Sequence, residues 1–161
     1  MKSHITLFVL LFTLFSFSQN KITTYYFIRH AEKVDDSKNP DLSSKGLERA
    51  LLWSKIFSDI NFDAIYSTDF KRTLQTATPI AANRNLEIIK YDPKIVDIQE
   101  FKTKTLGQTV LIVGHSNTTP EFVNKIIDKI IYASIEDSIF GNLYIVTLNG
   151  TLISYQLLKL P

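Results

Sequence analysis

Apolar residues follow two alternating kinds of pattern along the chain. Short runs rich in β-branched and aromatic residues predict strands, and they cover residues 23–29, 64–67, 86–89 and 110–113. Longer stretches between them have apolar residues three and four positions apart, which predicts helices. Strands and helices that alternate in this way favour one α/β domain with a mostly parallel sheet.

The first predicted helix has a capping residue and an apolar face. Ser43 or Ser44 can accept hydrogen bonds from the first turn, and the helix should run to about residue 58. Its predicted inner stripe is Leu47, Ala50, Leu51, Ser54 and Phe57.

Two further helices are predicted after the next strands. One begins at Thr68 or Asp69, and Pro79 is expected to kink it or end its first part. Its inner side is predicted to hold Leu74, Ala77 and Thr78. The other begins where Thr119 supplies an N-cap and Pro120 the first helical residue, and it continues to about residue 131.

The remaining segments are predicted as loops and a hairpin. Residues 34–42 are polar and predict a loop, whereas residues 91–104 fit either a loop or a helical turn. Residues 143–148 and 151–157 alternate around Asn149-Gly150, which predicts a closing β-hairpin.

Residues 1–18 have the layout of a secretory signal peptide. A short basic start precedes an apolar run from residue 5 to 17, and Ser16 and Ser18 supply small residues before a cleavage point. We therefore expect cleavage after Ser18 and a secreted or periplasmic domain over residues 19–161. An uncleaved membrane anchor is the alternative, although the apolar core is shorter than the roughly 20 residues of a spanning helix.

The composition excludes several kinds of functional site. The chain has no cysteine, which excludes disulfides, a thiolate nucleophile and a cysteine-based metal site. The formal net charge is only +2, so no overall field would attract nucleic acid or an anionic membrane. Any attraction for anions must therefore be local.

Basic side chains follow three of the predicted strands. Arg29 and His30 end the first strand, Arg72 lies in the first turn after the second, and His115 follows the strand at 110–113. The carboxyl ends of parallel strands meet at one edge of a sheet, where helix N-termini also offer free N–H groups. We expect these four side chains to share that edge.

These residue types suit phosphoryl chemistry. Guanidinium groups match the oxygens of a phosphoryl group with forked hydrogen bonds. A neutral imidazole can attack phosphorus and carry the phosphoryl group, and a second imidazole can donate to an oxygen. Taken singly, each arginine could be a surface residue and each histidine a structural one. Zinc bound by His30 and His115 would leave both arginines unexplained.

Four segments resemble the histidine phosphatase superfamily, which includes phosphoglycerate mutase. Residues 27–33 (FIRHAEK) resemble its Arg-His signature, with Ala31 where glycine is usual. Residues 42–46, 66–77 and 113–116 resemble the family's later motifs in the same order, and the match spans about residues 24–130.

The resemblance implies a fold and roles for the site residues. It implies a three-layer α/β/α, phosphoglycerate mutase-like fold, with helices on both faces of a mostly parallel sheet. His30 would accept the phosphoryl group, and Arg29, Arg72 and His115 would hold phosphate, with no metal or other cofactor. Lys33 and Asn117 adjoin the motifs and are expected to bind substrate.

The general acid is the open position in this assignment. Many members carry a glutamate in a helical insertion between the second arginine and the second histidine, but residues 91–108 are short here. The candidate carboxyl groups are Asp92, Asp97, Glu100 and Glu32. Asp92 is favoured because it directly follows a short predicted strand.

The sequence thus predicts a monomeric, metal-independent phosphatase with a phosphohistidine intermediate at His30. Its substrate would be a phosphorylated small molecule or a phosphoprotein, with no nucleic acid and no stable membrane association after leader cleavage. The short 91–108 segment suits bulky or varied phosphoesters. The alternatives are a non-hydrolytic phosphate- or phosphoester-binding protein of the same fold and a mutase.

Overall fold

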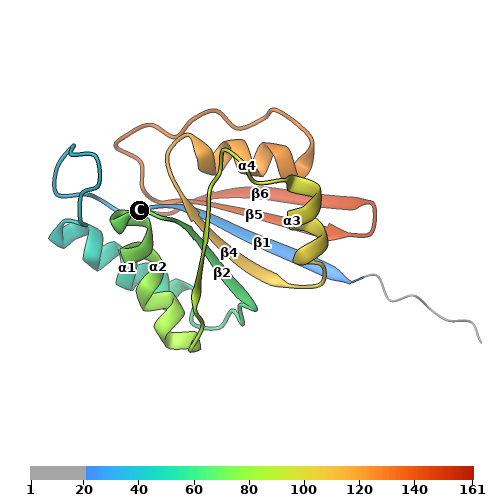
Figure 1. Cartoon of the computed structure of the whole chain (residues 1–161), viewed down its shortest axis with the longest axis horizontal. Coiled ribbons are helices and arrows are strands. Elements are labelled where there is room, and N and C mark those ends of the chain that lie inside the picture. Colours follow the sequence, from blue (N-terminus) through green and yellow to red (C-terminus); the bar gives the residue numbers. More distant parts are fainter. Residues whose placement is uncertain (1–20) are drawn as a thin grey trace, which may run out of the picture.

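The computed structural model describes residues 21–161 (Figure 1). The predicted signal peptide and its cleavage point after Ser18 lie outside the described residues. The elements follow one another in the order β1 (Ile22–Arg29), α1 (Ser44–Ile56), β2 (Ala64–Thr68), α2 (Lys71–Arg84), β3 (Ile88–Tyr91), α3 (Ile98–Lys104), β4 (Thr109–Gly114), α4 (Thr118–Ile127), β5 (Asn142–Asn149) and β6 (Leu152–Lys159).

The strands form one mixed sheet in the order β3-β2-β4-β1-β5-β6. The pairs among β1, β2, β3 and β4 are parallel, whereas β5 runs antiparallel to both β1 and β6. The prediction of a mostly parallel sheet is therefore corrected. The predicted hairpin at Asn149-Gly150 is confirmed, and strands joined by so short a turn have to pair antiparallel.

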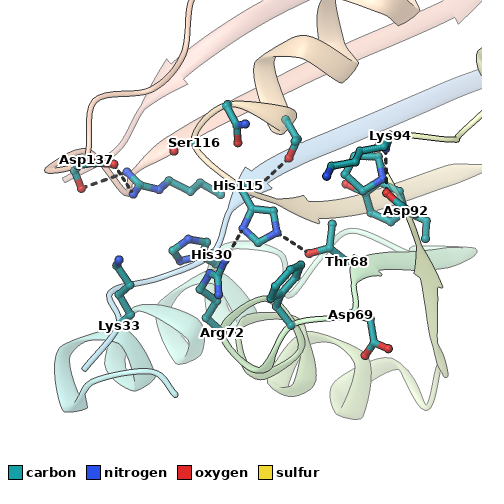
Figure 2. Close-up of a pocket in the computed structure, with 16 residues that line it drawn as sticks. His30, Lys33, Thr68, Asp69, Arg72, Asp92, Lys94, His115, Ser116 and Asp137 are labelled. Carbon is teal, nitrogen blue, oxygen red and sulfur yellow. Dashed lines mark hydrogen bonds and ion pairs between the residues drawn. The ribbon is translucent and has the colours of Figure 1, made fainter. Parts of the chain in front are cut away.

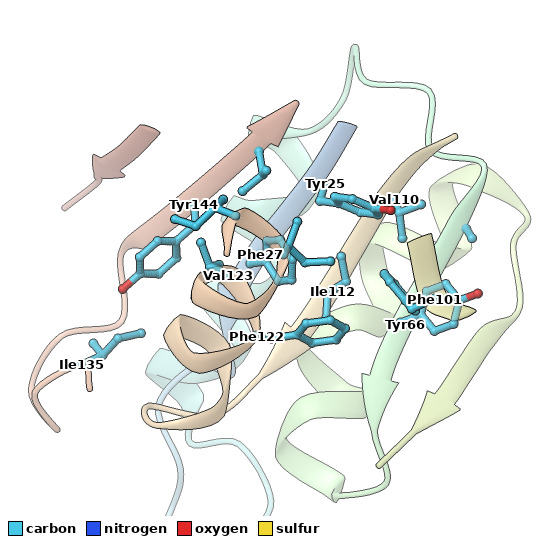
Figure 3. Close-up of a cluster of buried hydrophobic side chains, with 14 residues drawn as sticks. Tyr25, Phe27, Tyr66, Phe101, Val110, Ile112, Phe122, Val123, Ile135 and Tyr144 are labelled. Carbon is cyan, nitrogen blue, oxygen red and sulfur yellow. The ribbon is translucent and has the colours of Figure 1, made fainter. Parts of the chain in front are cut away.

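Helices cover both faces of the sheet, as predicted. In Figure 1, α1 and α2 lie on one side of it and α3 and α4 on the other. Successive residues of β1 point to opposite faces of the sheet. Phe27 packs in the hydrophobic cluster under α3 and α4, and Ile28 packs in the cluster under α1 and α2. Figure 3 shows the first of these clusters, where Phe101 and Phe122 meet at 5.1 Å between ring centroids. The second contains Trp53, stacked on Phe57 at 5.4 Å and only 1% exposed.

Helix α1 begins as predicted, and Ala50, Ser54 and Phe57 of its predicted inner stripe are buried. The Ser43 side chain accepts the N–H of Gly46, which confirms the cap. Leu47 and Leu51 are about half exposed, however, while Trp53 is buried. Gly46 is also buried, and a Cβ there would stand 2.0 Å from the carbonyl oxygen of Glu32. Only glycine allows α1 to approach the segment after β1 this closely.

The other helix boundaries differ from the predictions by a few residues. Helix α2 starts later than predicted and runs through Pro79, because Ala77, Ile80 and Ala81 are buried on either side of the proline. That packing offsets the roughly 3 kcal/mol that proline costs inside a helix. Its predicted inner residue Thr78 is exposed.

Helix α4 begins at Thr118, with Asn117 rather than Thr119 as the N-cap. It ends at Ile127 because Asp128 adopts the left-handed conformation, with φ 53°. The unassigned segment 91–104 contains α3, which Asp97 caps by accepting the N–H groups of Gln99 and Glu100. Within residues 21–161, no helix combines the length and apolar character needed to cross a membrane.

Candidate active site

A pocket of about 540 Å³ lies where β1, β2 and β4 end. These strands are neighbours and parallel, so their carboxyl ends meet at one edge of the sheet. Figure 2 shows the side chains that line it. Seven of the residues predicted for the site lie in this lining, namely Arg29, His30, Lys33, Arg72, Asp92, His115 and Asn117.

His30 extends β1 into the pocket with its imidazole in a fixed orientation. Its backbone N–H donates to the carbonyl of Gly114 at 2.9 Å, and its Nδ1 lies 2.7 Å from the carbonyl of Ala31. Because a carbonyl only accepts, Nδ1 carries the hydrogen and Nε2 keeps its lone pair. Burial lowers the pKa of His30 to about 3, aided by the charges of Arg29 and Arg72 and by His115, against the hydrogen bond to Ala31. The ring is therefore neutral at neutral pH.

His115 follows β4 and faces His30 edge-on, with 5.5 Å between ring centroids. Its Nδ1 lies 3.4 Å from Nη2 of Arg72, which can only donate, so Nε2 carries the hydrogen and donates to Oγ1 of Thr68 at 2.9 Å. The Thr68 hydroxyl donates in turn to Thr73. Burial lowers the pKa of His115 to about 4, followed by the charges of the two arginines. A phosphate dianion would oppose this shift and favour the protonated ring.

Arg29 is only 3% exposed and is clamped by the connection between α4 and β5. Its Nη1 donates to the carbonyls of Glu136, Asp137 and Ile139 at 2.9, 3.1 and 2.9 Å, and Nη2 lies 3.3 Å from the Asp137 carboxylate. The guanidinium also lies 4.3 Å from the ring centroid of Phe140. Burial lowers the pKa of Arg29, against the charge of Asp137. Sequence reasoning missed these partners, which lie 107 to 110 residues along the chain and carry no local pattern.

Arg72 is held less tightly, at the second residue of α2. Its guanidinium lies over the ring of Phe70, 4.6 Å from the centroid, and contacts His115. The carbonyl of Lys38 is 3.5 Å away, at the limit of a hydrogen bond. Burial lowers the pKa of Arg72. This leaves N–H groups of a pocket-lining guanidinium available for an anion.

The start of α4 completes the same edge. Asn117 caps the helix without a side-chain hydrogen bond. The N–H of Thr119 donates to the His115 carbonyl and Pro120 has no N–H, which leaves the N–H of Thr118 without a hydrogen-bond partner among residues 21–161. Gly114 precedes His115 for a steric reason: a Cβ there would stand 2.7 Å from Oγ1 of Thr119 and 3.2 Å from the Tyr91 hydroxyl. The glycine lets the end of β4 pass close to these hydroxyls just before His115.

Three carboxylates line the pocket, and they differ in their partners. Asp69 pairs with Lys90 at 2.8 Å, and Asp137 pairs with Arg29. Asp92 accepts the backbone N–H of Lys94 at 2.9 Å and has no ion pair with any of residues 21–161.

The other predicted acid candidates lie outside the pocket lining. Glu32 faces Arg49 through contacts of 2.9–3.0 Å, with Lys45 nearby. Burial by itself would raise the pKa of Glu32, but the hydrogen bonds and charges of these cations outweigh it and leave the pKa lowered. Asp97 caps α3, and Glu100 lies in its first turn. Over residues 21–161, no three histidine, cysteine or acidic side chains gather as metal ligands.

Known proteins resemble this chain in sequence and in fold. Residues 25–99 fit the family model of the histidine phosphatase superfamily (branch 1), and they carry Arg29, His30 and Arg72. Over these residues the chain matches the histidine phosphatase superfamily. The alpha-ribazole phosphatase of Shigella flexneri shares the fold, with a TM-score of 0.69 over 85% of this chain and 96% of that protein, at 13% identity.

Two curated relatives share shorter segments with this chain. Phosphoserine phosphatase 1 of Hydrogenobacter thermophilus is 40% identical over 78 residues, which is 44% of this chain and 36% of that protein. The lipopolysaccharide core heptose(II)-phosphate phosphatase of Salmonella typhimurium is 33% identical over 104 residues, 55% of this chain and 50% of that protein. The matches thus span half or less of each relative.

Proposed function

We propose that this protein is a metal-independent phosphatase that hydrolyses phosphate monoesters, or a phosphoprotein, through a phosphohistidine at His30. The observation that carries the proposal is the state of His30. Its Nδ1 hydrogen is committed to the Ala31 carbonyl, so a neutral Nε2 is left free in a pocket lined by two arginines. That is the arrangement a nucleophilic imidazole needs.

In the first step, the Nε2 lone pair of His30 forms a bond to phosphorus as the bond to the leaving oxygen breaks. The leaving oxygen takes a proton from Asp92 and departs as an alcohol. Arg29, Arg72 and His115 bind the equatorial oxygens, where the charge of the transition state is spread. His115 is protonated by its contact with the dianion and donates one of these hydrogen bonds.

In the second step, water attacks the phosphohistidine. The water oxygen forms a bond to phosphorus while the bond to Nε2 breaks, and Asp92 takes a proton from the water. Inorganic phosphate leaves, and His30 returns to its neutral form. Asp92 loses a proton in the first step and regains it in the second.

Asp92 is the best supported acid among the lining carboxylates. Donating a proton from Asp69 or Asp137 would require a group already in an ion pair, with Lys90 or Arg29. Asp92 has no such partner among residues 21–161, and its hydrogen bond to the Lys94 backbone fixes its carboxyl in the pocket wall.

The names of the relatives support a phosphorylated small molecule as substrate. One names phosphoserine, and another names a heptose phosphate of the lipopolysaccharide core. The predicted leader would deliver residues 19–161 as a monomer to the periplasm or the exterior. Lys33 and Asn117 line the pocket and would contact the substrate.

The deciding experiment follows turnover and the intermediate together. The purified protein should hydrolyse p-nitrophenyl phosphate with EDTA present, and alkaline quenching during turnover should trap a phosphoryl group on the His30 peptide, read by mass spectrometry. His30→Ala should lose both signals while circular dichroism shows a folded chain. Activity that survives in His30→Ala would contradict the proposal.

A second candidate is a phosphoester-binding protein, and the exposure of Asp92 favours it. Water around an exposed carboxyl competes with the leaving oxygen for its hydrogen bonds, so Asp92 is less firmly positioned as an acid than a buried group would be. Wild-type protein that binds phosphate without turnover, and loses the binding in Arg72→Ala, would establish this second function.

A further inference from the structure

Lys94 is a cation in the pocket wall that the proposed reaction does not use. Figure 2 shows its side chain extending from the segment after β3 with the amine directed toward His115. Its Nζ makes no ion pair or hydrogen bond with any of residues 21–161. The other lining cations all have partners: Arg29 pairs with Asp137, Lys33 with Asp36, and Arg72 contacts His115.

The turn that carries Lys94 is closed by hydrogen bonds to Asp92. The carbonyl of Asp92 accepts the N–H groups of Ile95 and Val96, and its carboxylate accepts the N–H of Lys94. Pro93 adds a fixed φ in the middle of the turn. These hydrogen bonds therefore fix the point in the pocket wall from which the Lys94 side chain extends.

The charges around the amine leave it available to an anion. Asp69 and Asp92 are the acidic groups on this side of the pocket, and Asp69 is already paired with Lys90. The phosphoryl oxygens have Arg29, Arg72 and His115, which is one donor group for each equatorial oxygen. Lys94 lies beside the proposed acid Asp92, which is the side where the leaving group departs.

We propose that Lys94 forms a subsite for a second anionic group carried by the leaving group. The substrate class is then a phosphoester whose alcohol bears a carboxylate or a further phosphate close to the scissile bond. This inference rests on the proposed function only in using its phosphate pocket, and it can be tested by binding alone.

The test uses three non-hydrolysable probes with the same phosphonate head. They are benzylphosphonates that carry at the para position a neutral carboxamide, a carboxylate, or a second phosphonomethyl group. Isothermal titration should show the wild-type protein binding the carboxylate or the second phosphonate about fivefold or more tightly than the carboxamide, the size of a partly exposed charge pair. The preferred anionic probe distinguishes the two kinds of second anion.

Lys94→Gln should bring the three affinities together, and Lys94→Glu should reverse the preference. Lys104→Gln is the matched control, since Lys104 is an exposed lysine on α3 outside the pocket lining, and it should keep the wild-type preference. Raising the salt concentration should reduce the preference of the wild type.

Two results would overturn the inference. One is equal affinity of the wild type for the charged and neutral probes. The other is a preference that persists in Lys94→Gln, or an equal loss for all three probes, which would place Lys94 on the phosphoryl group itself. Absence of p-nitrophenyl phosphate turnover would instead count against the proposed function and leave this binding result intact.

Discussion

The two sides of the pocket are built differently. The side with His30 and His115 sits at the ends of β1 and β4, and its groups are fixed by hydrogen bonds to Ala31 and Thr68. The other side consists of turns and exposed side chains around Asp92 and Lys94. Groups that must meet phosphorus in one geometry are placed by the sheet, and groups that meet a variable leaving group are placed by loops. Changes on the two sides should therefore affect different measurable quantities.

The sharpest difference lies between the two arginines. Arg72→Ala removes a phosphate donor and should lower kcat/KM by about 100-fold or more, with a small change in the free energy of unfolding. Arg29→Ala should cause a similar loss and also destabilise the fold by about 1–3 kcal/mol, because three carbonyls of residues 136–139 lose their donor. Kinetics and urea unfolding check both. If Arg29→Ala is as stable as Arg72→Ala, the hydrogen bonds from Arg29 to residues 136–139 do not stabilise the fold.

Substitution of Asp92 tests whether this carboxyl gives a proton to the leaving group. Asp92→Asn should lower kcat by about 100-fold on an alkyl phosphate, whose alkoxide needs a proton. It should lower kcat by less than about threefold on p-nitrophenyl phosphate, whose phenolate leaves without one. The ratio of the two rates is the measurement. Equal losses on both substrates would mean that Asp92 acts only through the turn that it shares with Lys94.

The histidine side should make stability depend on pH. The folded protein holds the pKa of His30 at about 3 and that of His115 at about 4. In the unfolded chain both should titrate near the ordinary value of about 6.5. Below that value the unfolded chain binds more protons, so the free energy of unfolding should fall by about 1–2 kcal/mol per histidine between pH 7 and 5. Urea unfolding at several pH values checks this, and His115→Asn should reduce the slope.

The smallest effect on activity is expected at Glu32. A substitution there should lower stability and leave the reaction almost unchanged. Glu32→Gln leaves the partly buried Arg49 without its counterion and should cost about 1–2 kcal/mol of stability. Since Glu32 is outside the pocket lining, kcat/KM should stay within about threefold of wild type. A loss of 100-fold on alkyl phosphates would instead make Glu32 the acid.

The local sequence pattern was enough to predict the side of the pocket that is formed by the ends of strands. Arg29, His30 and His115 directly follow apolar runs, and the rule that parallel strands end at one edge brings them together. The same reasoning located Arg72 through the start of the next helix. It failed where long-range contacts decide, as at Arg29 and its loop partners, or at Gly46, whose close approach to Glu32 no local pattern indicates. It also did not single out Lys94, because an exposed lysine in a turn has no pattern of its own.

The buried indole of Trp53 gives these experiments a convenient optical probe. It is the chain's one tryptophan, and it stacks on Phe57 in the layer under α1 and α2, outside the pocket lining. Its fluorescence should report unfolding of that layer and stay nearly constant when phosphate or a phosphonate binds. A loss of activity can therefore be separated from a loss of structure in the same cuvette, without labelling the protein.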